Sequence, residues 1–300
     1  MLHNDKELFE QAVLHTSQAL GVEPSIVEKD YFVTLFLKEI SKESLRIIFK
    51  GGTSLSKCHK LIKRFSEDID LNIECETKPT QGQRKSLKST IVSIIDRLQL
   101  TLVNSDQIRS NRDFNKYIVD FPSFFESDTL KPHLVVETAV YIRSYPVQQM
   151  PTSSMIYDFF LQNTLNDLIE KYDLGPFVLN VQTAERTFID KVYAVGDYYL
   201  DEKIREHSRH LYDLYKLLEI VKLDENLRPL ILSVHDDRKK HKKCYSVQDE
   251  IDMYKLLDDI ISKDIYKEDY ETITATLLFE EVSYCEVITA LKTIRDSRLF

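Results

Sequence analysis

The chain has 300 residues, of which 43% are hydrophobic and 30% charged, with only 6 Gly and 8 Pro. This composition suits a compact, helix-rich protein with a sizeable core, and it excludes a disordered or fibrous chain. The formal net charge of -9 argues against a protein coated in positive charge for indiscriminate nucleic-acid binding.

No apolar stretch is long enough to cross a membrane, since the one at residues 26–37 is interrupted by Glu28, Lys29 and Asp30. The N-terminus has neither a basic start nor an apolar signal core. We therefore expect a cytoplasmic protein without a membrane partner. The four cysteines show no close pair with zinc-ligand spacing, and we assign them no chemistry.

The first third of the chain predicts two helices, a strand, a helix and a second strand. The helices lie at residues 4–20 and at 24–40, where Pro24 suits a first helical turn. The apolar run at 45–50 stops at a double glycine and predicts a buried strand. A helix capped by Thr53 or Ser54 should follow through residue 62. Residues 68–73, DIDLNI, alternate polar and apolar side chains, which predicts a strand with two opposite faces.

A helix at 84–98 and strands at 116–121 and 133–140 complete an N-terminal core. After Pro151 the patterns are helical, at 154–168, 184–199, 205–221, 227–239, 247–262 and 272–294. We therefore predict an α+β protein with a core at residues 1–150 and an α-helical domain at 151–300.

The strongest chemical pattern combines a glycine turn with paired aspartates. Carboxylates at i and i+2 of a strand, here Asp68 and Asp70, can hold one or two Mg²⁺ ions against a triphosphate. Gly51-Gly52, between strand and helix, lets a phosphate approach free main-chain N–H groups. Each pattern alone has an ordinary alternative, a tight turn or a solvated strand face. Their combination predicts a metal and triphosphate site.

Four segments resemble motifs of one family. FKGGTSLSKCHKLIKRFSEDIDLNI, residues 49–73, resembles the signature of the AbiEii-type toxin family, a branch of the nucleotidyltransferase superfamily with a DNA polymerase beta-like core. The other segments are similar to its further helices, at 28–37, 185–195 and 208–218. The gap between Gly52 and Asp68, residues 53–67, is longer than in many polymerase beta-like enzymes. The resemblance implies a nucleotidyltransferase core with a mixed sheet and a helical domain that completes the active-site cleft.

The resemblance also implies site residues. The nucleotide-binding set is Gly51, Gly52, Thr53, Ser54 and Lys57, and the catalytic set is Asp68, Asp70, Lys191 and Asp213. Asp68 and Asp70 would hold Mg²⁺ or Mn²⁺ with Glu137 as a third ligand, although a Glu137 paired with Lys or Arg is nearly as well supported. Lys191 would contact the triphosphate. Asp213 would orient Lys191 or act in catalysis, its alternative being an i, i+4 ion pair with Arg209.

The implied activity is transfer of NMP from an NTP to RNA, with a tRNA 3′ end as the leading acceptor, by a toxin that inhibits translation and growth. A cognate antitoxin would be its protein partner, and no DNA specificity is indicated. Nucleotidylation of protein, a kinase-like phosphate transfer and a catalytically silent nucleotide-binding module stay open as alternatives.

Three basic clusters are candidate binding sites for an RNA backbone. For each of them a solvated helix face or loop is the alternative. The clusters are Lys57, Lys60, Lys63 and Arg64; Arg84, Lys85 and Lys88; and Arg238, Lys239, Lys240, Lys242 and Lys243.

Overall fold

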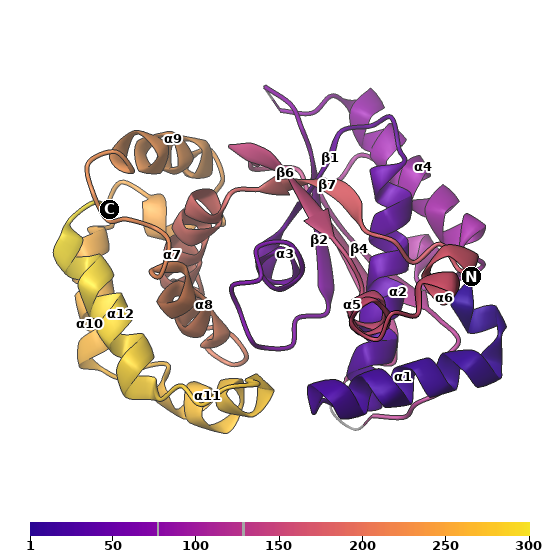
Figure 1. The fold of residues 1–300 in the computed structure, drawn as a ribbon. Helices are drawn as coiled ribbons and strands as arrows, with labels where there is room; N and C mark the ends of the chain where they lie inside the picture. Colours follow the sequence, from indigo (N-terminus) through magenta and orange to yellow (C-terminus); the bar gives the residue numbers. More distant parts are fainter. Residues whose placement is uncertain (77, 128–129) are drawn as a thin grey trace. The chain divides into compact units, whose positions relative to one another are not determined.

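The computed structural model describes residues 1–76, 78–127 and 130–300 (Figure 1). The chain divides into two compact units: the first comprises Met1–Cys58 and Ser66–Val181, and the second comprises His59–Phe65 and Gln182–Phe300. The chain therefore passes between the units three times. Within the described residues, no helix has the length and apolar character needed to cross a membrane.

A seven-stranded sheet forms the centre of the first unit, in the order β3-β4-β5-β2-β1-β7-β6. Its strands are β1 (Ile47–Lys50), β2 (Asp68–Ile73), β3 (Thr101–Leu102), β4 (Phe114–Asp120), β5 (His133–Ala139), β6 (Val147–Thr152) and β7 (Phe177–Gln182). Strand β2 runs antiparallel to β1 and parallel to β5. The sheet is thus mixed, and the predicted α+β class is confirmed.

Strands β6 and β7 lie outside the predicted strands, and β7 falls within the part of the chain predicted to be helical. Strand β7 pairs in parallel with β1, which places Ile48 opposite Asn180 and Phe49 opposite Val181. A pairing between segments so far apart in sequence leaves little local pattern to read. The first unit consequently extends to Val181 rather than to about residue 150.

Six helices accompany this sheet in the described part of the first unit: α1 (Lys6–Leu20), α2 (Pro24–Ser41), α3 (Gly51–Lys57), α4 (Gln81–Arg97), α5 (Met155–Gln162) and α6 (Asn166–Lys171). Pro24 lies in the first turn of α2, as the sequence predicts. Helix α4 begins earlier than predicted because Thr80 and Gln83 form a capping box. The predicted helix at 154–168 is two helices, with Thr164 between them at φ 56°.

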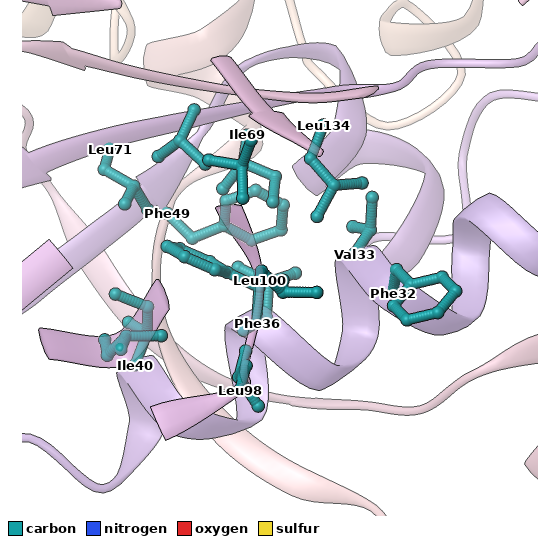
Figure 2. Packing of buried hydrophobic residues seen from close by; sticks show 14 of the residues in the cluster. Phe32, Val33, Phe36, Ile40, Phe49, Ile69, Leu71, Leu98, Leu100 and Leu134 are labelled. Atoms are coloured by element: carbon teal, nitrogen blue, oxygen red, sulfur yellow. The ribbon is translucent and has the colours of Figure 1, made fainter. Parts of the chain in front are cut away.

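Apolar side chains of α2 pack with those of the strands in one core (Figure 2). Helix α4 contributes further side chains to the same core. Phe36 of α2, Phe49 of β1 and Ile69 of β2 are fully buried within it. Burial of a side chain of this size contributes about 1.5–3 kcal/mol. This core fixes β1 and β2, the two strands on either side of the double glycine in the sequence.

Helix α3 is shorter than predicted, and neither Thr53 nor Ser54 caps it. Thr53 Oγ1 instead donates to the main-chain oxygen of Asp68 at 2.6 Å, and Ser54 Oγ donates to that of Gly51 at 2.8 Å. The chain then leaves the helix at Cys58, because residues 59–65 join the second unit. A local sequence pattern does not carry that information.

The second unit is helical. Its helices are α7 (Ala184–Leu200), α8 (Arg209–Leu217), α9 (Arg228–Lys239), α10 (Met253–Ser262), α11 (Lys267–Thr272) and α12 (Tyr284–Ser297). Fully buried side chains from three of them, Phe188 of α7, Leu211 of α8 and Leu291 of α12, contribute to its apolar interior. Helices are predicted where α7, α8, α9, α10 and α12 lie, and the structure shortens several of them. Helix α11 is not predicted, and the predicted helix at 272–294 begins only at Tyr284.

Candidate active site

The double glycine lies beside the carboxylate of Asp70. Strand register places Lys50 opposite Asp70, so the next residue, Gly51, turns the chain at that point. Gly51 has φ +77°, and a Cβ built on it would lie 2.0 Å from Oδ2 of Asp70. Both the backbone conformation and the lack of space therefore require glycine at this position.

Asp68 and Asp70 alternate along β2 with Ile69 and Leu71, which are fully buried. The predicted two-faced strand is thus confirmed for residues 68–71. Asn72 departs from the pattern, since it is buried and its Nδ2 donates to the main-chain oxygen of Ile142 at 2.7 Å. The more accessible polar face of the strand therefore ends at Asp70.

Oδ1 of Asp68 is buried and accepts no hydrogen bond from any residue that the structure describes. Such an oxygen costs free energy unless a cation meets it. The Nζ atom of Lys131 forms an ion pair with this oxygen at 3.7 Å, a distance too long for a hydrogen bond. This unsatisfied oxygen suits a divalent ion, and Mg²⁺ needs only one or two protein carboxylates beside substrate oxygens and water.

The proposed third ligand, Glu137, lies opposite Asp70 in the parallel pairing of β2 with β5. Its carboxylate also forms an ion pair with Lys116 at 3.1 Å. Across the described residues, no three or more His, Cys, Asp or Glu side chains form a group that could hold a metal. A metal would therefore have to be held by Asp68 and Asp70 jointly with substrate. Metal binding at this pair and the ligand role of Glu137 stay predictions.

Three charged residues outside the predicted set, Lys29, Glu67 and Lys131, form a series of ion pairs that ends at Asp68. Glu67 forms an ion pair with the buried Lys29 and lies 3.4 Å from Nζ of Lys131. Burial lowers the pKa of Lys29, whereas the charge of Glu67 opposes that shift. The sequence signal for this contact is the charged triplet within the apolar run at 26–37, because a charge in that setting needs a partner.

The side chains predicted to bind nucleotide have partners within the first unit. Lys57 is buried, and its Nζ donates to Oδ1 of Asp30 at 2.5 Å. Thr53 Oγ1 also lies 2.9 Å from Oγ of Ser66, in addition to its bond to Asp68. These contacts hold the turn in shape. The main chain of Gly51 and Gly52 is the part of this segment best suited to approach a phosphate.

In the second unit, Lys191 of α7 and Asp213 of α8 form a buried ion pair. Lys191 Nζ donates to Oδ2 of Asp213 at 2.5 Å. Arg64 is the second cation on this carboxylate, and within the described residues Arg209 forms no ion pair with it. Burial alone would raise the pKa of Asp213, but the charges of Arg64 and Lys191 outweigh burial and hold the pKa well below its usual range. This contact is the one that the predicted orienting role of Asp213 requires, and that role stays a prediction.

The three basic clusters largely meet acceptors inside their own units. Arg64 binds Asp213, and Arg84 lies 3.2 Å from a carboxylate oxygen of Asp113. In the cluster at 238–243, three cations form ion pairs, namely Arg238 with Asp190 and Asp197, Lys239 with Asp249, and Lys240 with Asp237. These contacts favour a structural explanation for many of the basic residues, and an RNA-binding site at any of the clusters stays a prediction.

The glycine turn, the Asp-x-Asp strand and the helical Lys-Asp pair all lie within a stretch of the chain that matches one family. The sequence pattern of "Nucleotidyl transferase AbiEii toxin, Type IV TA system" matches residues 35–293. The chain belongs to the AbiEii family of nucleotidyltransferase toxins. The resemblance carried by the motifs is thereby confirmed, and the match continues past residue 218, where the motifs end.

The chain is similar to solved structures, and MenT4 shares its fold. MenT4, a nucleotidyltransferase toxin from Mycobacterium tuberculosis H37Rv, is 17% identical with a TM-score of 0.56, and the match covers 95% of this chain and 88% of MenT4. JHP933 from Helicobacter pylori is 15% identical with a TM-score of 0.45, with 91% of each chain covered. No curated protein sequence matches the chain. The likeness to MenT4 shows that this fold occurs in a nucleotidyltransferase toxin.

Proposed function

We propose that this AbiEii toxin transfers a nucleoside monophosphate from an NTP to a hydroxyl group of RNA, with a tRNA 3′ end as the leading acceptor. The acceptor hydroxyl loses its proton to solvent and its oxygen bonds to the α-phosphorus. The bond from that phosphorus to the oxygen bridging it to the β-phosphorus breaks, and pyrophosphate leaves with that oxygen. Capping or extending the acceptor end of tRNA would block translation and arrest growth. A cognate antitoxin would be the partner that relieves this arrest.

One observation carries the proposal: Asp70 lies against a glycine that has no room for a Cβ, next to the unsatisfied oxygen of Asp68. Asp68 and Asp70 would hold Mg²⁺ or Mn²⁺, which neutralises triphosphate charge when bound. The main chain of Gly51 and Gly52 would accept the phosphates, since glycine permits close approach. Lys191, oriented by Asp213, would supply positive charge to the leaving pyrophosphate.

The test is incubation of the protein with Mg²⁺, total RNA and each NTP in turn, labelled at either the α- or the γ-phosphate. We expect the α-label to enter RNA, and Asp68→Ala to abolish that transfer. Asp106→Ala is the matched control, because Asp106 is an exposed carboxylate of the same unit. Its activity should equal that of the unchanged protein.

Each alternative has its own result in this experiment. Entry of the γ-label would identify a kinase-like phosphotransferase, and α-label in protein but not in RNA would identify a protein-nucleotidylating enzyme. The absence of any transfer would favour the silent nucleotide-binding module. If RNA is the acceptor, added salt should weaken its binding steeply.

A further inference from the structure

Arg64 is the one member of the basic cluster at 57–64 that reaches the Lys191–Asp213 pair among the described contacts. It is 4% exposed and belongs to the segment His59–Phe65, which joins the second unit. Main-chain hydrogen bonds hold this segment in place: Phe65 N donates to Leu277 O at 3.2 Å, and Phe279 N donates to Lys63 O at 2.8 Å. The position of Arg64 is therefore fixed by the backbone on both sides.

The guanidinium of Arg64 grips both oxygens of Asp213. Nε donates to Oδ1 at 2.7 Å and Nη2 donates to Oδ2 at 2.8 Å. Two parallel charge-assisted bonds of this kind set the plane of a carboxylate as well as its position. Lys191 Nζ then donates to an Oδ2 atom whose orientation is already fixed.

The buried cluster formed by Arg64, Lys191 and Asp213 contains two cations and one anion. Asp213 is fully buried, and the side chains of Arg64 and Lys191 are 3% and 8% exposed. His210, whose Nδ1 lies 3.5 Å from Lys191 Nζ, adds no charge near neutral pH, because burial and the neighbouring cations Lys191 and Arg209 keep its pKa well below 6.5. Burial, and to a lesser extent the charge of Arg64, lowers the pKa of Lys191, whereas Asp213 opposes that shift. With Lys191 protonated, the three residues carry an excess positive charge, whereas Lys191 and Asp213 alone would form a neutral pair.

We propose that Arg64 is a positioning residue for Lys191: it takes up the charge of Asp213, so that Asp213 orients the Lys191 ammonium without cancelling its attraction for a triphosphate. This inference rests on the proposed contact of Lys191 with the triphosphate. It differs from a purely structural role, in which Arg64 would only stabilise the unit. The two roles make different predictions for anion binding by folded variants.

The experiment measures binding of inorganic tripolyphosphate by titration calorimetry at fixed Mg²⁺, which avoids any contribution from a base or an acceptor. Arg64→Gln leaves a neutral pair and should weaken binding roughly tenfold, as Lys191→Met should. The double variant Arg64→Gln/Asp213→Asn removes one charge of each sign. It should bind about threefold or more tightly than Arg64→Gln alone, because the excess positive charge returns.

Arg228→Gln is the control, since Arg228 pairs with Glu225 on the surface of the same unit. Its tripolyphosphate binding should be unchanged. Thermal melts accompany each titration, so that a loss of fold is separated from a loss of binding. If Arg64→Gln does not fold, Arg64→Lys replaces it: this variant keeps the charge but not the two parallel hydrogen bonds, so it should still bind more tightly than Lys191→Met.

Wild-type binding by folded Arg64→Gln, with weak binding by Lys191→Met, would overturn the role of Arg64 and leave the proposed function standing. A double variant that binds no better than Arg64→Gln would also overturn it, as would Arg64→Lys binding as weakly as Lys191→Met. Unchanged binding by Lys191→Met would show that Lys191 does not contact the triphosphate, and the inference about Arg64 would fail as well. Transfer of the α-label to RNA would still be judged separately by Asp68→Ala.

Discussion

The carboxylates of the first unit and of the second lie in opposite environments. Asp68 has a 23% exposed side chain and one buried oxygen without a hydrogen-bond donor in the described part of the chain. Asp213 is fully buried, and each of its oxygens accepts from a cation. The charge of Asp213 is therefore satisfied by hydrogen bonds within the protein, whereas one oxygen of Asp68 keeps its capacity to accept a bond from a ligand. Substitutions should therefore separate the two: loss of the Asp68 carboxylate should cost activity with little stability, whereas loss of the Asp213 carboxylate should also cost stability.

The largest expected effect on stability follows from Asp213→Ala. The variant leaves Arg64 and Lys191 buried without a counter-charge, and the free energy of unfolding should fall by about 3–5 kcal/mol. Asp68→Asn, by contrast, should change it by less than about 1 kcal/mol. Urea unfolding measures both values. Equal losses for the two variants would refute the distinction between the units.

An intermediate effect is expected at the glycine turn, where Gly21 provides a matched control. Gly51 and Gly21 both have positive φ, but a Cβ on Gly21 would meet no atom of the described residues within 4 Å. Alanine should cost about 1–2 kcal/mol at either position through φ alone. At Gly51 the displaced Asp70 should add to that loss and abolish nucleotidyl transfer. Equal unfolding energies and equal activities for the two variants would contradict the close contact.

The smallest effect concerns pH and His207, whose ring stacks on Tyr198 with centroids 3.5 Å apart. Burial, followed by the charge of Arg209, lowers the pKa of His207 from 6.5 to about 4. The unfolded chain therefore binds this proton first, and stability is lost as pH falls from 6.5 toward 4. Between pH 7 and pH 5, His207→Gln should lose about 1–2 kcal/mol less than the original protein in urea unfolding. An identical pH dependence would show that His207 is not held neutral.

The sequence predicts those features that depend on neighbouring residues. The alternation in DIDLNI is local, so both the strand and the common face of Asp68 and Asp70 can be deduced from it. Pro24 and the apolar spacing after it likewise indicate α2. The family pattern then confirms the class of enzyme, while the catalytic roles of the site residues stay predictions.

Features that depend on contacts between distant segments cannot be predicted from local sequence patterns. Strand β7 is defined by its pairing with β1, and Arg64 by its contact with a carboxylate on α8. In sequence, Arg64 is one cation among several and resembles part of an RNA-binding surface. Only the fold distinguishes it, because the burial of a charge depends on where its partner lies.

Residues 59–65 belong to the second unit although they lie in the sequence between two parts of the first. This limits how the protein can be divided into fragments. A fragment ending at Val181 would contain Arg64 but lack Asp213, and residues 63–65 would lose their main-chain partners at 277–279. A fragment beginning at Gln182 would keep Asp213 but lose the guanidinium that grips it. Neither half is a self-sufficient module, so the gene should tolerate a break or a fusion at residue 181 poorly, although that point separates the two units in space.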